Sequence, residues 1–254
     1  MDSLERRVRS GPDRLGLIQP NRVACIVPAW NEGARIASVV RGVPKSAVGA
    51  IFVVDDGSTD DTAAAAEAEG ARVLRQTRNR GVGAAIRAGM IAAKTMGFEA
   101  AIMISGAGKS PPDQIPQLLA VLDNGVDLVQ GSRYVQGGSQ MRMPLGRVFG
   151  TLAYSWLFSL LSGHRVHDAS SGFRAVRLSM LDDPRIRLDQ EWLDHYELEP
   201  YLLFKALSCG FRVVEVPMRV EYPPAGNSYT KMRAIIGWWS IFRPVLFLAL
   251  RIRS

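Results

Sequence analysis

The sequence predicts an α/β fold, a single domain in which helices flank a mostly parallel sheet. Four short apolar runs, each read as a strand, are each followed by residues that favour a turn or a helix. They are residues 23–27, 51–54, 71–74 and 100–104. Strands that alternate with helices in this way are typical of a parallel sheet covered on both faces. The composition, 47% apolar and 22% charged over 254 residues, is ordinary for a globular protein with a full core.

The strand at residues 51–54 ends on two adjacent carboxylates, Asp55 and Asp56. Gly57 and Ser58 then favour a turn, and residues 59–62 offer N-cap groups to an alanine-rich helix over 63–69. Ligands of open α/β sheets bind beyond the carboxyl ends of the strands, so this stretch is a candidate binding site. The alternative is an ordinary strand–helix loop whose aspartates cap the helix.

Two further loops follow strands in the same half. The strand at 23–27 ends at Pro28, and Trp30 then offers either a face for a base or a core residue. Residues 79–89 place glycines at the start of a helix, where they allow a ligand to approach the backbone closely. This glycine pattern is neither a P-loop nor a dinucleotide-binding fingerprint, so its signal is weak by itself.

The second half continues with helices and strands of less regular spacing. We expect helices over 113–122, 147–161 and 196–207, and strands over 126–130, 211–216 and 219–222, with the last two paired to each other. Residues 183–193 are charged and show no apolar period, which indicates a surface loop.

Charge and cysteine content restrict the partners and the location. The formal net charge is +7, which suits an anionic ligand or surface. We expect no nucleic-acid partner, because the sequence lacks zinc-ligand spacing, an aromatic RNA-binding signature and a helix-turn-helix pattern. Cys25 and Cys209 are isolated, which indicates a reduced, cytoplasmic location. The N-terminus has no apolar core of the kind a signal peptide needs, and no uninterrupted apolar run reaches the ~20 residues of a membrane span.

Together the loop motifs resemble a known family. Residues 26–32, 53–62 and 79–83 resemble the nucleotide-sugar-binding half of a family 2 glycosyltransferase with the Rossmann-like GT-A fold. Downstream motifs resemble the polyprenyl-phosphate glycosyltransferases, the dolichol-phosphate mannosyltransferase group; they are residues 131–138, 168–174 and 210–217. The resemblance covers about residues 22–233. It implies an inverting enzyme that moves a sugar from a GDP- or UDP-sugar to a lipid phosphate at a membrane surface.

The resemblance also implies roles for individual residues. The catalytic candidates are Asp168, Lys109 and Arg147. The candidates for binding the nucleotide sugar and the acceptor phosphate are Pro28, Trp30, Glu32, Val54, Asp55, Asp56, Arg80, Gly81, Ser105, Gly106, Ala107, Arg133, Thr151, Ser228 and Lys231. Glu197 matches a further acid of the family, but Tyr201 stands where another carboxylate is common.

One departure from the family pattern concerns the metal. The family holds Mg²⁺ or Mn²⁺ with an Asp-x-Asp motif after the fourth strand, but Ser105 and Ala107 occupy those positions here. Hard divalent cations prefer anionic oxygen ligands, and alanine has no ligand atom, so we predict no metal ligands at these positions. Our hypothesis is that Lys109, at the position of a family glutamine, supplies part of the missing positive charge. Two alternatives remain: a non-catalytic protein that binds a nucleotide sugar, and the same fold acting on a soluble acceptor.

The ends of the chain complete the predicted organisation. Residues 1–21 form a flexible basic arm, either a solvated tail or a contact for anionic lipid, and residues 22–233 form the domain. Residues 234–254 combine apolar side chains, two tryptophans and arginines, and Pro244 would kink or divide a helix there. This amphipathic segment predicts a helix in the membrane interface, hence a peripheral protein on the cytoplasmic face. The alternatives are a terminal helix docked on the core and an oligomer interface.

Overall fold

The computed structural model describes residues 17–222 and 234–252. The strands are β1 (Val23–Ala29), β2 (Ala50–Asp55), β3 (Arg72–Arg75), β4 (Ala100–Met103), β5 (Leu128–Ser132), β6 (Ser139–Met141), β7 (Arg174–Arg177), β8 (Val213–Pro217) and β9 (Arg219–Glu221). The α-helices are α1 (Gly33–Gly42), α2 (Thr62–Ala68), α3 (Val82–Thr95), α4 (Ile115–Leu122), α5 (Leu145–Ser162), α6 (Leu198–Ser208) and α7 (Ala234–Ala249). Short 3₁₀ helices are η1 (Pro20–Arg22), η2 (Pro112–Gln114), η3 (Leu178–Asp182) and η4 (Glu191–Leu193).

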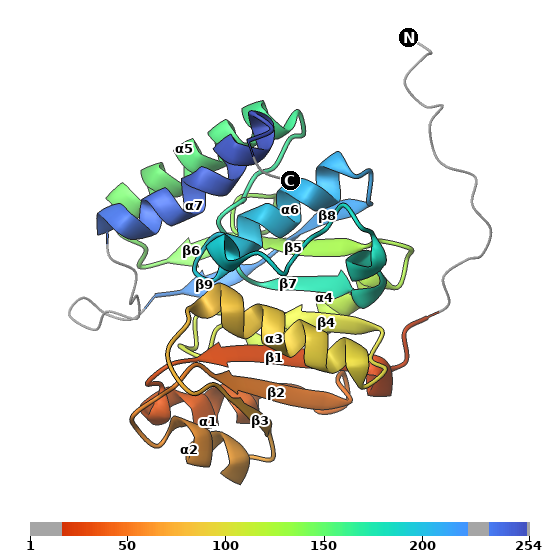
Figure 1. Cartoon of the computed structure of the whole chain (residues 1–254), viewed down its shortest axis with the longest axis vertical. Coiled ribbons are helices and arrows are strands. Elements are labelled where there is room, and N and C mark those ends of the chain that lie inside the picture. Colours follow the sequence, from red (N-terminus) through yellow and green to blue (C-terminus); the bar gives the residue numbers. More distant parts are fainter. Residues whose placement is uncertain (1–16, 223–233, 253–254) are drawn as a thin grey trace.

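Seven strands form one sheet in the order β3-β2-β1-β4-β7-β5-β8 (Figure 1). All neighbours in this sheet are parallel except β7, which runs antiparallel between β4 and β5. The prediction of a mostly parallel sheet flanked by helices is therefore confirmed. Strand β7 was not predicted, because its four residues begin and end with an arginine, Arg174 and Arg177, and both arginines are buried.

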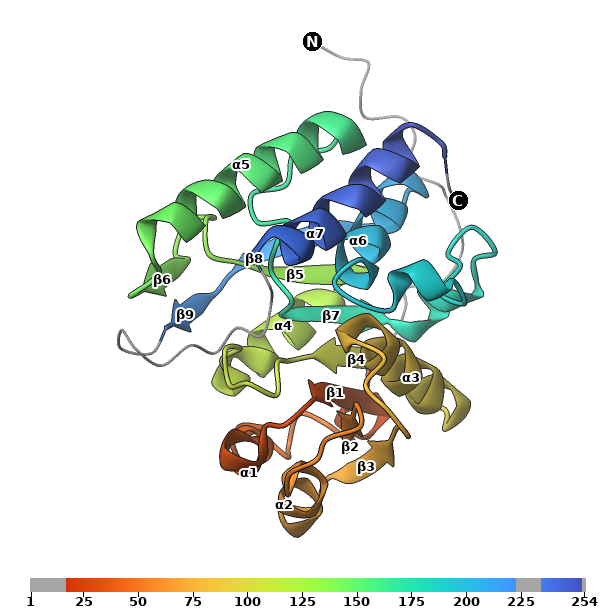
Figure 2. The ribbon, with the colours of Figure 1, turned by 60° about the vertical axis from the view of Figure 1, so that its left-hand side comes forward.

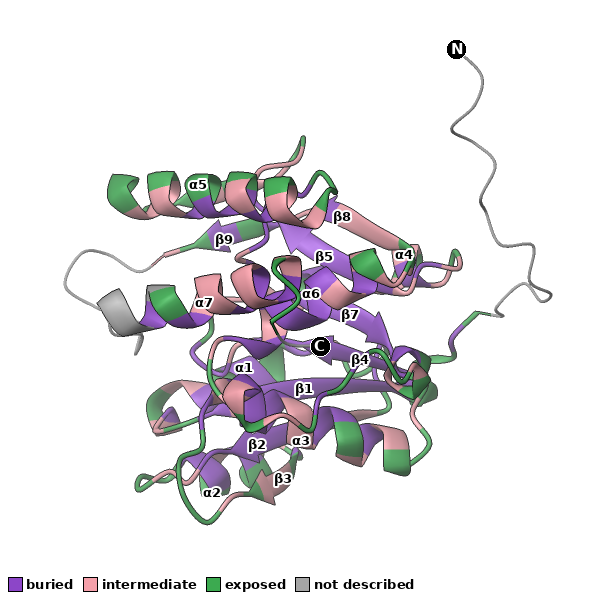
Figure 3. Ribbon diagram, turned by 45° about the horizontal axis from the view of Figure 1, so that its top comes forward, coloured by how far each residue is buried: buried purple, intermediate pink, exposed green. Residues whose placement is uncertain are grey.

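The sheet separates two apolar cores, one on each face. Along β1, Ala24 and Ile26 belong to the core under α3, α5, α6 and α7, whereas Cys25 and Val27 belong to the core under α1, α2 and α4. This alternation follows from the period of two in a strand. Figure 3 shows the buried strands enclosed between helices that are exposed on their outer sides.

Helix α7 packs against α5 and α6 (Figure 2). Val245 and Leu248 are buried in the core, and the Tyr154 hydroxyl on α5 donates a hydrogen bond to the Ile241 carbonyl, 3.2 Å away. Pro244 lies inside α7 and does not divide it. These contacts agree with the alternative of a terminal helix docked on the core. Among the described residues, none of the helices is both long and apolar enough to cross a bilayer.

Two local predictions are wrong. Residues 183–193 are not a free surface loop, because Ile186, Leu188 and Leu193 are buried in the core beside α6. Strand β9 does not pair with β8; it pairs in parallel with β6 in a separate two-stranded sheet. The chain turns out of the main sheet just after Pro217, where the Met218 N–H donates to the Ser132 carbonyl.

Candidate functional site

A cavity of about 600 Å³ lies beyond the carboxyl ends of β1, β2 and β4 and extends to α5, α6 and α7. Most of the predicted site residues line it: Pro28, Trp30, Glu32, Asp56, Gly81, Ser105, Ala107, Lys109, Arg133, Arg147 and Thr151. Val54, Asp55, Arg80, Gly106 and Asp168 are not among the lining residues. Ser228 and Lys231 lie outside the described residues.

Side chains of the loop after β2 hold the loop after β1. Ser58 Oγ, Thr62 Oγ1 and Asp60 Oδ2 accept hydrogen bonds from the backbone N–H groups of residues 31, 32 and 33, at 2.8–3.0 Å. These bonds fix the backbone next to Trp30, whose side chain is 39% exposed at the cavity. The polar residues of this loop, predicted as capping groups, therefore also shape the cavity wall.

The two strand-end carboxylates are already engaged by the protein. Asp55 Oδ1 accepts the Ser58 N–H at 2.9 Å, and the two oxygens of Asp56 accept the N–H groups of Arg80 and Gly81 at 2.8 Å each. Burial raises the pKa of Asp56, although these two hydrogen bonds act in the opposite direction. Asp56 therefore anchors the start of α3 while one side of it lines the cavity.

The glycines at the start of α3 face the protein's own backbone. A Cβ atom on Gly83 would lie 2.0 Å from the Leu193 carbonyl oxygen, and one on Gly81 would lie 2.5 Å from the Asp194 carbonyl oxygen. The Asp194 carbonyl accepts the Ala84 N–H at 2.9 Å, so the segment after η4 caps α3. We expected these glycines to let a ligand approach the backbone. This expectation is wrong for Gly83, because residues 193–195 occupy the space next to it. Gly81 also borders the cavity.

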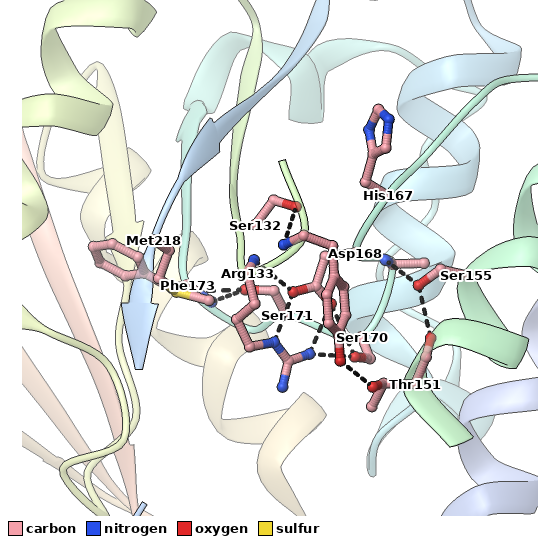
Figure 4. Close-up of polar contacts among 12 residues, drawn as sticks. Ser132, Arg133, Thr151, Ser155, His167, Asp168, Ser170, Ser171, Phe173 and Met218 are labelled. Atoms are coloured by element: carbon pink, nitrogen blue, oxygen red, sulfur yellow. Dashed lines mark hydrogen bonds and ion pairs between the residues drawn. The ribbon is translucent and has the colours of Figure 1, made fainter. Parts of the chain in front are cut away.

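Arg133 and Asp168 form a buried ion pair (Figure 4). Arg133 Nε and Nη2 donate to the two carboxylate oxygens at 2.7 Å, and the Arg133 backbone N–H donates at 3.0 Å. Burial acts to lower the pKa of Arg133, but the hydrogen bonds and charge of Asp168 hold it above its ordinary value. Glu215 accepts the Asp168 N–H at 2.9 Å and keeps this carboxylate in place. Asp168 is fully buried and does not line the cavity. Its negative charge is matched by Arg133.

Arg147 has different surroundings, although it lines the same cavity. Within residues 17–222 and 234–252 its guanidinium forms no ion pair, and its Cζ lies 5.4 Å from the centre of the Tyr222 ring. One turn later on α5, the Thr151 hydroxyl is 2.5 Å from the Tyr134 hydroxyl. Arg147 thus brings to the cavity a positive charge that no described residue pairs with, and Thr151 lines the same cavity.

Two glutamates lie at the start of α6, and only one of them lines the cavity. Glu197 is fully buried and forms an ion pair with Arg243 at 2.6 Å, whereas Glu199 lines the cavity. Residues two apart lie on nearly opposite faces of a helix, so only one of them can reach the cavity. Burial raises the pKa of Glu199, and the charge of Arg174 partly opposes this shift. Sequence reasoning missed Glu199, His195 and Tyr196 as cavity residues, because the start of α6 was not located well enough, whereas Arg174, part of the motif at residues 168–174, lines the cavity.

The loop after β4 does not fit a divalent cation. Ala107 contributes only a buried methyl group, and Ser105 Oγ accepts a hydrogen bond from the Ala107 N–H at 3.3 Å. The described residues contain no group of three or more His, Cys, Asp or Glu side chains placed to hold a metal ion. Lys109, also predicted in this loop, is cationic, half-buried and lines the cavity.

The sequence model described as glycosyl transferase family 2 matches residues 24–183, more than half of the chain. The chain belongs to this family. Its similar relatives include polyprenol monophosphomannose synthase of Mycolicibacterium smegmatis, 31% identical over 84% of this chain and 83% of the relative. Undecaprenyl-phosphate mannosyltransferase of Micrococcus luteus is 32% identical over 82% of this chain and 86% of the relative.

Solved structures support the fold of this family 2 enzyme. Glucosyl-3-phosphoglycerate synthase of Mycobacterium tuberculosis in complex with UDP has a TM-score of 0.68 and 22% identity, and the match covers 91% of this chain and 81% of that chain. The same synthase was also solved with UDP and Mn²⁺, with a TM-score of 0.67 and 23% identity over 91% and 79% of the two chains. The GT-A fold and the glycosyltransferase activity implied by the resemblance are therefore confirmed.

Proposed function

We propose that this glycosyltransferase moves a sugar from a GDP- or UDP-sugar, with inversion, to a polyprenyl phosphate. The observation that carries the proposal is the Arg147 guanidinium, which lines the cavity with its charge uncompensated by any described residue. An arginine binds phosphate oxygens in a bidentate manner, and Thr151 adds a hydroxyl on the same face of α5. The names of two relatives, which specify mannose transfer to polyprenol and undecaprenyl phosphate, support the acceptor class.

The proposed reaction is a single in-line displacement. An oxygen of the acceptor phosphate attacks the anomeric carbon, and the bond to the diphosphate breaks with its electron pair leaving on the diphosphate. The acceptor is ionised at neutral pH, so no side chain has to remove a proton. Because Asp168 neutralises Arg133, we assign the charge that offsets the phosphates mainly to Arg147, and Lys109 is a second cationic residue that lines the cavity. Asp168 and Arg133 then act as support for the loop that carries Ser170, whose hydroxyl contacts both.

Lys109 takes a share of the role that a cation has in relatives with Asp-x-Asp. A unit charge about 4 Å from a phosphate oxygen contributes about 4 kcal/mol at an effective dielectric constant of about 20. We predict that turnover survives EDTA and that Lys109→Ala lowers kcat by about 10²-fold or more, as the loss of an oxyanion contact does. Radiolabelled sugar transfer, assayed with EDTA and with added Mg²⁺ or Mn²⁺, checks both. Activity that disappears with EDTA and returns with Mg²⁺ would contradict the role of Lys109.

We further propose that the enzyme works at the cytoplasmic face of a membrane through α5. The exposed apolar residues of this helix recur every three or four positions and form one stripe, which we call the α5 apolar stripe: Leu145, Phe149, Leu152, Trp156 and Leu160. Arg147 and Thr151 lie on the opposite face, toward the cavity. A lipid acceptor with its chains in the bilayer would then present its phosphate near the cavity.

Partition of the labelled product between organic and aqueous phases tests the function. A GDP- or UDP-sugar panel with a polyprenyl phosphate should give label that extracts into organic solvent. Label that moves only into a water-soluble product would favour the soluble-acceptor alternative, and nucleotide-sugar binding without transfer or hydrolysis would favour the non-catalytic one. Inversion is checked by the anomeric configuration of the product.

A further inference from the structure

Tyr222, the last residue described before residue 234, contacts two arginines of the cavity, Arg133 and Arg147. Its hydroxyl accepts a hydrogen bond from Arg133 Nη1 at 3.2 Å, and Arg147 Cζ lies 5.4 Å from the centre of its ring. Its backbone N–H donates to the Met141 carbonyl at 2.9 Å, which ties it to β6. The ring is therefore fixed by its backbone and by the buried Arg133–Asp168 pair.

The two contacts affect the arginines differently. Arg133 already gives Nε and Nη2 to Asp168, so Tyr222 receives the remaining terminal nitrogen. For Arg147, an aromatic face attracts the cation but occupies none of its N–H donors, since the attraction comes from the ring quadrupole. Arg147 can thus be held in one place while its donors stay available to an anion.

We propose that Tyr222 is a positioning residue that holds the Arg147 guanidinium at the acceptor end of the cavity. The chain of contacts runs from Asp168 through Arg133 and the Tyr222 hydroxyl to the ring and then to Arg147. The statement that Arg147 meets the acceptor phosphate rests on the proposed function. The statement that Tyr222 holds the Arg147 guanidinium in place rests on the contacts alone.

Kinetics separate positioning from a general loss of structure. Tyr222→Leu removes the ring, and we expect the KM for a short-chain polyprenyl phosphate to rise about tenfold, with the donor KM changed less than about twofold. Tyr222→Phe keeps the ring and loses only its hydrogen bond to Arg133, so its acceptor KM should rise less than that of Tyr222→Leu. Adding Tyr222→Leu to Arg147→Ala should cause little further change, because both remove the same interaction. Phe98→Leu, which removes a half-buried ring next to Phe52, is the matched control and should leave both KM values unchanged.

A measurement on the free enzyme tests the contact without any substrate. In wild type, the Arg147 Nε–H resonance, assigned by its absence in Arg147→Ala, should be shifted upfield by the Tyr222 ring. It should lose that shift in Tyr222→Leu and keep it in Tyr222→Phe. An unchanged resonance in Tyr222→Leu, or equal rises of donor and acceptor KM, would overturn the proposal. If Tyr222→Leu loses the shift of the Arg147 resonance but the wild-type enzyme makes no lipid-linked product, the proposed lipid acceptor is wrong. The positioning of Arg147 by Tyr222 is then still supported.

Discussion

At the scale of single residues, Arg133 and Arg147 show how surroundings decide what a side chain can do. Both were predicted to contact phosphate, and both line the cavity. Each lies over a tyrosine ring, but Arg133 is 7% exposed and paired with Asp168, whereas Arg147 forms no ion pair with a described residue. A paired guanidinium offers a ligand little net charge, so the two arginines are not interchangeable.

Gly83 gives a first prediction on stability. Gly83→Ala should lower the free energy of unfolding by about 2–3 kcal/mol, because its methyl group would press on the backbone of Leu193 and displace the cap of α3. Gly146→Ala is the matched control, since nothing lies within 4 Å of its added Cβ and the helix should gain up to about 1 kcal/mol. Urea unfolding of both variants checks this. If the two variants were equally stable, the prediction would be wrong, because residues 193–195 would then move aside at little cost.

Glu199 gives a prediction on pH dependence. Burial raises its pKa above the ordinary value, so the folded protein binds this proton more tightly than the unfolded chain does. Its contribution to stability is therefore favourable at low pH and is lost as pH rises from the ordinary pKa to the raised one. Glu199→Gln should be more stable than wild type above this window and equal to it below. Thermal unfolding across pH 3–8 measures the difference in stability between Glu199→Gln and wild type. Glu221→Gln, at an exposed carboxylate, is the matched control.

At the scale of elements, α7 is joined to α6 by a buried charge pair. Arg243→Met would leave the fully buried Glu197 carboxylate without its partner and should cost about 3 kcal/mol or more of stability. Replacing both residues with Met should recover at least half of this loss. The exposed pair of Arg22 and Glu99 is the control, and Arg22→Met should cost less than about 1 kcal/mol. A double variant as unstable as Arg243→Met would contradict the pairing.

The elements that the sequence predicted well are those whose packing is visible in local pattern. Strands β1, β2 and β4 are continuous apolar runs, which a strand buried on both faces requires. Strand β7 was not predicted, because the buried Arg177 donates its hydrogen bonds to carbonyl groups of residues 122 and 126, which are over 50 positions away in the chain. The buried residues of 183–193 were not predicted, because they pack against several elements and therefore show no regular apolar period in the sequence.

The candidate site shows the same division. The strand-end positions were predictable because parallel strands bring their carboxyl ends to one edge. The partner of Arg133 was not, because Asp168 is 35 positions away and only the antiparallel β7 brings its loop there. Glu199 was missed because the resemblance pointed to Glu197, and only the packing of α6 shows which of the two glutamates reaches the cavity.

At the scale of the whole molecule, apolar side chains are exposed on two neighbouring helices, in the α5 apolar stripe and at Trp239 of α7, and the chain carries a net charge of +7. Trp156→Asp should lower binding to vesicles with anionic lipid by about tenfold, because it puts a carboxylate where a ring was buried in the interface. Ile91→Asp, at a similarly exposed position on α3, should leave binding unchanged. Trp239→Asp in the same vesicle-flotation assay separates α7 from α5. Equal losses in Trp156→Asp and Ile91→Asp would exclude α5 as the docking face.

The cap of α3 has a consequence for synthesis on the ribosome. Asp194, which bonds to Arg80 across 114 positions, emerges long after the first four strands have left the exit tunnel. Until then, the Ala84 N–H at the start of α3 lacks its carbonyl acceptor, and the first half of the enzyme lacks one wall of its pocket. A nascent chain arrested before residue 190 should therefore bind no nucleotide, and it should gain this ability only when the segment after η4 has been released.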